Sequence, residues 1–364
     1  MRIVYVLPSL GIGGAERQVV ALSERMKAGG HTVALVVLLG RQREEWPTTV
    51  ETLRLDARRN LLGVVTALFR VQRFLRAFQP DLIHGHVFPA NMAARFFKLF
   101  YPGAVVLSTV HNVYEGGWGR MLAYRLTDCL SCRTIAVSAA AAERYVRLKA
   151  IPARKSLVLK NGIDCKEFTP SPERRVRLRR SMGVRQEFVW LAAGRIVPAK
   201  DYPNLLRAFT QVVRELPEAQ LWIAGEAGGA ESASIQAQAS ELGAAVRWLG
   251  LRREMPALMD AVDGFVLASA WEGMPLVVGE AMAMEMPVVA TDVGGVRELM
   301  GDVGVIVPAK CPERLAEAML ATMRGTEAER RKSGQAGRVR ICEAFSLEAK
   351  AREWELVYRA HLTR

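Results

Sequence analysis

The chain has 364 residues, of which 50% are hydrophobic and 24% charged, as expected of a globular protein. This length is enough for two domains, each with its own core. The formal net charge of +13 favours an anionic partner, which would be nucleic acid, anionic lipid or a phosphorylated substrate.

The apolar runs and the cysteines of the chain indicate in which cell compartment the protein is located. The longest wholly apolar run, residues 33–39, is too short to span a bilayer. The chain opens on a predicted strand, Arg2 to Leu7, with no basic-then-apolar leader. The five cysteines form no regular framework, and the C-x-x-C pair Cys129 and Cys132 lacks the second pair that completes a zinc site. We therefore expect a cytoplasmic protein.

A strand, a glycine-rich turn, a helix and a second strand are predicted at the start of the chain. Gly11, Gly13 and Gly14 follow the first strand and precede the helix, where glycine lets the backbone approach a phosphate or a sugar. A dinucleotide-binding turn would need a third glycine at the position of Glu16. The turn alone is therefore weak evidence for a ligand, and a simple tight turn explains it equally well.

Residues 61–79 have helical periodicity, with arginines at a spacing of three (Arg70, Arg73 and Arg76) among phenylalanines. Arg95 and Lys98 lie beside further phenylalanines. Such helices can lie on an anionic membrane surface, although a helix of this kind more often buries its apolar face in its own domain. Both interpretations stay open.

Histidines follow two predicted strands in the first half of the chain. His84 and His86 lack a third partner at a readable spacing, which argues against a metal site. His111 lies just past the strand that ends near Val110, in the position of a ligand-facing residue. A structural, hydrogen-bonded histidine is an equally good interpretation of His111 from the residues alone.

The composition changes near residue 165, where Pro170 and Pro172 precede five arginines within residues 174–180. This pattern predicts a linker followed by a solvated basic helix. No stacking aromatic residues are interleaved with the arginines, so we expect no nucleic-acid binding there. A second series of strands and helices begins at residue 188. Arg195 and Lys200 fall in its first loop, where two cations are able to neutralise a diphosphate.

Residues 265–293 form a predicted strand–helix–strand unit with two carboxylates eight positions apart. Glu272 precedes the helix and Glu280 is the only charged residue between Pro275 and Met284. Free N–H groups at the start of a helix favour an anion, and the two carboxylates are able to hold hydroxyl groups beside it. One capping and one internally paired glutamate would explain the same spacing.

The pattern Glu-Gly-x-Pro-x4-Glu, followed by MPVVATDVGG, resembles the E-x7-E motif of retaining glycosyltransferases of family 4. Three further motifs occur in that family's order: GGAE at residues 13–16, the His111 loop, and G-R-x4-K at residues 194–200. The resemblance covers nearly the whole chain. It implies an α/β protein of the GT-B fold, with two Rossmann-like doubly wound domains facing a cleft. The acceptor-side domain would span residues 1–168, the donor-binding domain residues 169–346, and a last helix, 347–364, would cross back to the first domain.

The resemblance also implies roles for individual residues. Arg195 and Lys200 would hold the diphosphate of a nucleotide-sugar donor, Glu280 its ribose, and Glu272 the hydroxyls of the transferred sugar. His111 would position that sugar. The other donor-binding residues would be Gly13, Gly14, Glu226, Gly273, Met274 and Leu276. The chain departs from the family pattern at two positions. Ala227 follows Glu226 where glycine is common, and Glu285 stands where glycine is usual. Glycine tolerates a left-handed backbone, which costs another residue roughly 1 kcal/mol.

These features predict a retaining hexosyltransferase that uses a UDP- or GDP-sugar, with no cofactor and no metal. The acceptor would be a glycan or a lipid-linked molecule of cell-envelope or exopolysaccharide synthesis, and the protein would be peripheral at the inner face of the membrane. Two alternatives remain. A GT-B-like epimerase would act on the donor alone, and a non-catalytic basic protein would bind membranes or nucleic acid without turnover.

Overall fold

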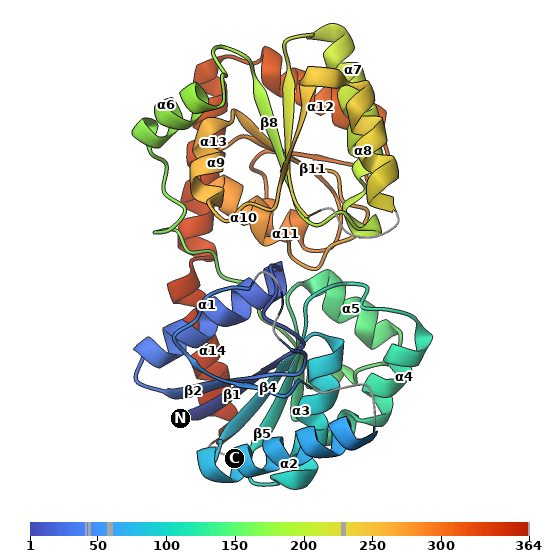
Figure 1. The fold of residues 1–364 in the computed structure, drawn as a ribbon, viewed down its shortest axis with the longest axis vertical. Helices are drawn as coiled ribbons and strands as arrows, with labels where there is room; N and C mark the ends of the chain where they lie inside the picture. The colour runs from blue at the N-terminus through green and yellow to red at the C-terminus, as the bar shows by residue number, and fades with distance from the viewer. Residues whose placement is uncertain (41, 43–44, 57–60, 227–230, 363–364) are drawn as a thin grey trace. The chain divides into compact units, whose positions relative to one another are not determined.

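Strands and helices alternate along the computed structural model, which describes the chain except residues 41, 43–44, 57–60, 227–230 and 363–364 (Figure 1). The chain divides into a first unit, residues 1–162 with 347–364, and a second unit, residues 163–346. Residues 163–168, which the sequence placed in the first domain, lie in the second unit. The reason is local, because the N–H of Ile163 donates to the carbonyl of Phe345 (2.8 Å) and its side chain packs against Gly279.

The first unit is built on a seven-stranded parallel sheet in the order β3-β2-β1-β4-β5-β6-β7. Alternate residues of β1 face opposite sides of the sheet. Tyr5 packs with α1 and α14 on one side, and Val4 and Val6 pack with α2 and α3 on the other. The strands are β1 (Arg2–Leu7), β2 (Thr32–Val37), β3 (Glu51–Arg54), β4 (Leu82–His86), β5 (Val105–Val110), β6 (Arg133–Ala136) and β7 (Ser156–Val158). The helices are α1 (Gly14–Ala28), α2 (Leu61–Phe78), α3 (Phe88–Phe100), α4 (Trp118–Leu126), α5 (Ala139–Arg147) and α14 (Leu347–Leu362).

The last helix, α14, packs on the first sheet. Its Trp354 and Tyr358 are buried among the residues of β1 and β4. The hydroxyl of Tyr358 lies 3.1 Å from the hydroxyl of Tyr5 and 2.9 Å from Nδ1 of His84. These contacts join the end of the chain to its first strand.

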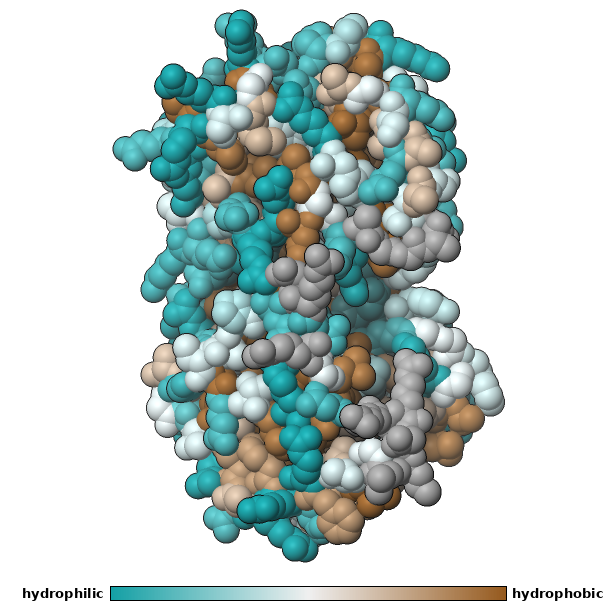
Figure 2. Space-filling model, viewed as in Figure 1, coloured by the Kyte–Doolittle hydropathy of each residue, from teal (hydrophilic) through white to brown (hydrophobic). Residues whose placement is uncertain are grey.

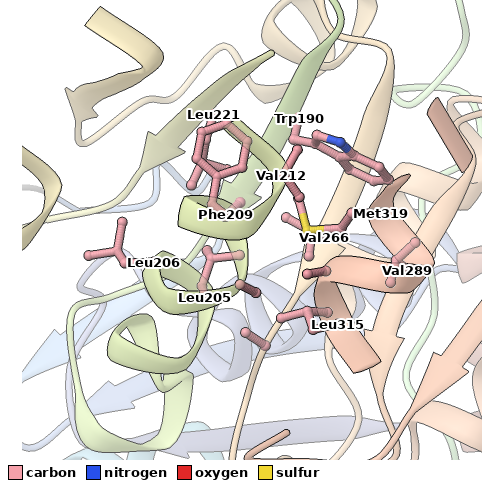
Figure 3. Close-up of a cluster of buried hydrophobic side chains, with 14 of the residues drawn as sticks. Trp190, Leu205, Leu206, Phe209, Val212, Leu221, Val266, Val289, Leu315 and Met319 are labelled. Atoms are coloured by element: carbon pink, nitrogen blue, oxygen red, sulfur yellow. The ribbon is translucent and has the colours of Figure 1, made fainter. Parts of the chain in front are cut away.

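The second unit has a six-stranded parallel sheet in the order β10-β9-β8-β11-β12-β13. One core cluster joins β8, β9, β11 and β12 to α7 and α12 and includes Trp190, Phe209 and Met319 (Figure 3). The strands are β8 (Val189–Ala193), β9 (Gln220–Ala224), β10 (Val246–Gly250), β11 (Gly264–Leu267), β12 (Val288–Thr291) and β13 (Val305–Val307). The helices are α6 (Pro172–Ser181), α7 (Tyr202–Glu215), α8 (Glu231–Glu241), α9 (Met255–Ala261), α10 (Leu276–Ala283), α11 (Val296–Met300), α12 (Pro312–Arg324) and α13 (Glu327–Ala344).

The fold class predicted from the sequence, two doubly wound parallel α/β units, is confirmed. In each unit the chain starts in the middle of the sheet, builds to one edge and then crosses to the other side. The strand order therefore reverses between β1 and β4 in the first sheet and between β8 and β11 in the second. Open α/β sheets bind their ligands at the carboxyl ends of the strands at such a reversal.

Two basic segments differ from their prediction. The arginines of α6 are not simply solvated, because Arg174 pairs with Asp260 (2.5 Å) while Arg175 and Arg179 pair with Asp263. They attach α6 to α9 and the segment that follows it. Arg95 of α3 is wholly buried, and its guanidinium donates to Ser108, Tyr124, Thr127 and Thr134. Arg95 is therefore a core residue of the first unit and adds nothing to a basic surface.

Candidate active site

Lys200 and Glu272 are 72 residues apart in the chain and meet at the reversal of the second sheet. Lys200 follows β8, Glu272 follows β11, and these two strands are neighbours. Nζ of Lys200 lies 2.6 Å from Oε1 of Glu272. The hydroxyl of Ser269 donates to the same oxygen at 2.7 Å. The carboxylate is thus held by one cation and one hydroxyl in a nearly buried position.

Glycines make the turn after β8 possible. The N–H of Gly194 donates to the carbonyl of Ala224 (2.9 Å), which draws the exits of β8 and β9 together. A Cβ on Gly225 would lie 2.0 Å from the carbonyl oxygen of Gly194, so no other residue fits there. A Cβ on Gly194 would lie 2.8 Å from Cε of Lys200, so the lysine stem crosses this glycine. The close packing fixes where the ammonium group lies.

Helix α7 begins immediately after Lys200. Its N-cap Asp201 is left-handed (φ +45°) and accepts the N–H of Asn204 at 3.3 Å. The hydroxyl of Tyr202 donates to the carbonyl of Gly194 at 2.7 Å. The cap and this bond tie the cation loop to the helix, so Lys200 is presented from a fixed turn.

The loop that carries Glu272 is locked to the turn after β12. The hydroxyl of Thr291 donates to the carbonyl of Ser269 (2.7 Å), and the N–H of Gly295 donates to the carbonyl of Gly273 (2.7 Å). Gly294 is left-handed (φ +54°), and a Cβ there would lie 2.0 Å from the carbonyl oxygen of Glu272. The two glycines of the DVGG segment therefore allow the turn after β12 to pack closely against the backbone of the Glu272 loop.

Glu280 lies within α10 and is buried, at 6% exposure. Gly273 and Met274 are buried in the loop before this helix, and Leu276 is its first residue. Pro275 is the N-cap of this helix.

Arg195 and Glu226 lie at the same edge of the second sheet with exposed side chains. The guanidinium of Arg195 has no hydrogen-bond or ion-pair partner within the described part of the chain. Glu226 follows β9, and its carbonyl accepts the N–H of Ile196 at 3.3 Å. The departure at Ala227 lies outside the described residues. The edge therefore carries Arg195, which has no partner in the described part of the chain, and the paired Lys200 five residues later. These are the charges that a diphosphate requires.

His111 lies at the carboxyl end of β5 in the first unit. Its Nε2 is 3.0 Å from Nδ1 of His86, the last residue of β4. Its N–H donates to Oε1 of Glu115 (2.8 Å), and the hydroxyl of Tyr124 donates to the other oxygen of that carboxyl (3.1 Å). His86 therefore holds the imidazole of His111, and Glu115 holds the backbone N–H of the same residue.

Burial controls protonation in this part of the first unit. Loss of hydration lowers the pKa of His111 to about 4 and lowers the pKa values of His84 and His86 well below their usual range. The three imidazoles are therefore neutral at pH 7. Burial also raises the pKa of Glu115 to about 7, although the N–H of His111 and the hydroxyl of Tyr124 oppose that rise.

Gly13 and Gly14 lie at the start of α1, Gly13 as its N-cap and Gly14 as its first residue. A Cβ on Gly13 would lie 2.3 Å from the carboxylate of Glu16. A larger residue at position 13 would therefore require the Glu16 side chain to move. The proposed contact with the donor stays a prediction.

The structure adds residues that the sequence did not single out. Ser269 and Thr291 support Glu272, and His86 and Glu115 support His111. Each ends or follows a strand at the carboxyl edge of its sheet, and that position was the available signal. Among the described residues, no group of three or more His, Cys, Asp or Glu side chains is arranged to hold a metal ion.

Family models match both units. The model described as Glycosyltransferase Family 4 matches residues 12–167, and the model described as Glycosyl transferases group 1 matches residues 187–324. The chain belongs to the family 4-like glycosyltransferases of the GT-B fold.

Curated members of this glycosyltransferase family are similar over part of the chain. The UDP-Gal:alpha-D-GlcNAc-diphosphoundecaprenol alpha-1,3-galactosyltransferase of Escherichia coli is 24% identical over 247 residues, which cover 65% of this chain and 64% of that enzyme. The GDP-mannose-dependent alpha-(1-6)-phosphatidylinositol monomannoside mannosyltransferase of Mycolicibacterium smegmatis is 33% identical over 159 residues, 40% of this chain and 41% of that enzyme. The chain thus matches less than two thirds of the length of either relative.

Solved structures share the glycosyltransferase fold over the full chain. HepE of Anabaena, in complex with UDP and glucose, has a TM-score of 0.86 at 20% identity and covers 99% of this chain and 100% of its own. Sucrose-phosphate synthase of Thermosynechococcus elongatus has a TM-score of 0.86 at 22% identity, with 100% of both chains covered. At these identities the likeness shows the fold.

Proposed function

We propose that this chain is a retaining hexosyltransferase that moves a sugar from a UDP- or GDP-sugar to a glycan or lipid-linked acceptor in cell-envelope or exopolysaccharide synthesis. The observation that carries the proposal is the Lys200–Glu272 pair at the reversal of the second sheet, with Arg195, which no described residue pairs, in the same loop as Lys200. This position is the ligand-binding edge of open α/β sheets, and its two cations match a diphosphate. The donor would bind mainly to the second unit and the acceptor to the first.

In this mechanism Arg195 and Lys200 stabilise the leaving group. The bond from the anomeric carbon to the β-phosphate oxygen breaks, and the diphosphate gains negative charge that the two cations offset. The acceptor hydroxyl attacks from the same face, and its proton passes to the departing phosphate oxygen. The sugar therefore keeps its anomeric configuration. The two cations supply the positive charge in this scheme, so we expect transfer to persist in the presence of a chelator.

The carboxylates hold the donor in place. Glu280 would accept hydrogen bonds from the ribose hydroxyls, and Glu272 would accept them from the sugar hydroxyls. The N–H groups of Gly273, Met274 and Leu276 would meet the sugar and phosphate, since backbone donors at a helix start favour an anion. Lys200 and Ser269 hold the Glu272 carboxylate in one position, which favours donor binding. His111 would position the sugar beside the acceptor.

Exposed apolar side chains on α2 and α3 support a peripheral membrane location. The two helices cover the same face of the first sheet and contain no acidic residue (Figure 1). α2 buries Val71 and Leu75 but exposes Phe69 (67%), while α3 exposes Phe96 (49%) and Leu99. Arg73 and Arg76 are exposed on α2. Hydrophobic side chains appear among hydrophilic ones where α2 lies at the surface (Figure 2). None of the described helices is long and apolar enough to cross a membrane.

A transfer assay tests the proposed reaction. The intact protein is incubated with UDP- and GDP-sugars, a lipid-linked acceptor and a chelator, and the product's anomeric configuration is read by NMR. We expect transfer with retention, and we expect Glu280→Ala and Lys200→Ala to abolish it. Unchanged transfer in either variant would refute the assignment of that residue. Donor conversion without acceptor would instead indicate the epimerase alternative. Salt-sensitive lipid or nucleic-acid binding without any turnover would indicate the non-catalytic one.

A further inference from the structure

His86 has one ring nitrogen engaged and one that is buried without a partner. Its Nδ1 lies 3.0 Å from Nε2 of His111, while its Nε2 has no hydrogen-bond partner among the described residues. His86 is 1% exposed, so bulk solvent does not reach this nitrogen. A buried polar atom without a partner is uncommon and calls for an explanation.

The bond between the two imidazoles restricts their tautomers together. Both rings are neutral at pH 7, so one must donate and the other must accept. If His111 donates through Nε2, its Nδ1 is a bare lone pair and the unpartnered Nε2 of His86 carries a proton. If His86 donates through Nδ1, then Nδ1 of His111 is protonated and Nε2 of His86 is a bare lone pair. The surroundings of His86 Nε2 therefore decide the state of His111.

Aromatic rings surround His86. The ring of Tyr5 lies 5.7 Å from it and that of Trp354 lies 6.5 Å from it, centroid to centroid, with tilts of 42° and 58°. The ring of His84 lies at 4.0 Å. Aromatic faces are electron-rich, so they attract an N–H and repel a bare nitrogen lone pair. The proton on Nε2 is also the intrinsically favoured form of neutral histidine, in His86 and in His111 alike. Both considerations favour the arrangement in which His111 donates to His86.

We propose that His86 is a positioning residue that fixes His111 in the tautomer protonated at Nε2, so that His111 presents the lone pair of Nδ1 to the reacting sugar and accepts a hydrogen bond from one of its hydroxyls. The second part rests on the proposed glycosyltransferase function. Nδ1 of His111 is unpartnered within the described residues, and the residue is partly exposed. A sugar hydroxyl is a suitable donor to this atom, whereas a phosphate oxygen is not, because it has no proton to give.

Nitrogen NMR of the intact protein, with ¹⁵N in its five histidines, tests the tautomer without any activity measurement. We expect His111 to show a protonated Nε2 and a bare Nδ1 at pH 7, with the signals assigned through His111→Asn. His86→Leu removes the acceptor and should convert His111 to a mixture of tautomers. His86→Asn, whose Oδ1 replaces Nδ1 as acceptor, should restore the single form. A proton on Nδ1 of His111, or an unchanged tautomer in His86→Leu, would overturn the proposal.

Kinetics test the consequence for the reaction. We expect His86→Leu to lower kcat/KM for transfer several-fold, because His111 loses both its single tautomer and its fixed ring orientation, and His86→Asn to recover most of it. His31→Asn, a substitution on the same unit away from this pair, should change neither the His111 signals nor kcat/KM. Equal losses in His86→Leu and His86→Asn with an unchanged spectrum would assign His86 a purely structural role and overturn the proposal. If the wild-type spectrum is as expected but no sugar is transferred, the tautomer assignment stands and the proposed function fails.

Discussion

The Lys200–Glu272 pair allows stability and function to be separated by a double-mutant cycle. The two side chains are 19% and 10% exposed, so the pair lies between a surface ion pair and a buried one. Exposed pairs contribute about 0–1 kcal/mol, and removing one partner of a buried pair costs about 3–5 kcal/mol. We therefore expect Lys200→Met to lower the free energy of unfolding by about 2 kcal/mol. The cause is the nearly buried Glu272 carboxylate, which would keep only the hydroxyl of Ser269.

Removing both charges should recover most of that loss. In Lys200→Met/Glu272→Gln the amide oxygen still accepts from Ser269 and no unpaired charge remains, so we expect a coupling energy of about 1–2 kcal/mol. Equilibrium urea unfolding followed by tryptophan fluorescence measures it, since Trp190, Trp222, Trp248 and Trp271 lie in the second unit. A coupling within about 0.5 kcal/mol of zero would show that the pair is not formed as described.

Donor binding should not recover in the same double variant. A charge-assisted hydrogen bond contributes about 1.5–3 kcal/mol, which corresponds to roughly 10- to 150-fold in Kd for the nucleotide diphosphate. A stable double variant with weak binding would show that Lys200 holds the donor. A stable double variant that binds as tightly as the wild type would refute the reasoning.

Three further predictions concern other parts of the chain. Glu285, which follows the C-cap of α10 in a left-handed conformation (φ +57°), is strained, so Glu285→Gly should raise the free energy of unfolding by about 0.5–1 kcal/mol. As a control, Glu317→Gly, within α12, should lower it by about 1 kcal/mol. The pKa of Glu115 is raised to about 7 by burial, so its contribution to stability is full below the unfolded value of 4.5 and is lost as the pH rises through 7. Urea unfolding at pH 5 and pH 8 should therefore show a fall of up to about 3 kcal/mol in the wild type that is absent in Glu115→Gln. Phe69→Glu with Phe96→Glu should abolish flotation with vesicles containing anionic lipid and leave transfer to a water-soluble acceptor unchanged; flotation equal to that of the wild type would contradict the membrane assignment.

The sequence predicted the elements around the second-unit site well. Apolar runs at residues 265–268 and 288–291 predicted β11 and β12 to within a residue, because buried parallel strands are short and continuously hydrophobic. The left-handed backbone expected where Glu285 replaces glycine is present. These features depend on local patterns, which a sequence shows directly.

Contacts between distant segments were not predictable in the same way. The bond from Ser269 to Glu272 and the bond from His86 to His111 depend on strand order, which periodicity does not give. Arg95 was interpreted as part of a basic surface, yet it is a core residue because β5, α4 and β6 together surround its guanidinium with acceptors. A charged residue is expected at the surface unless tertiary contacts supply partners for its charge, and those contacts are not visible in the sequence.

The central claim is that the second unit binds a nucleotide-diphosphate sugar where β8 and β11 end. Calorimetric titration of UDP, GDP and ADP, each in the presence of a chelator, into the wild type and Arg195→Ala tests it most directly. Arg195 has no partner within the described residues, so its replacement removes the proposed ligand contact and breaks none of the hydrogen bonds or ion pairs described above. The account predicts that UDP or GDP binds saturably to the wild type and about tenfold or more weakly to the variant. No binding of any nucleotide, or equal binding to both proteins, would contradict it.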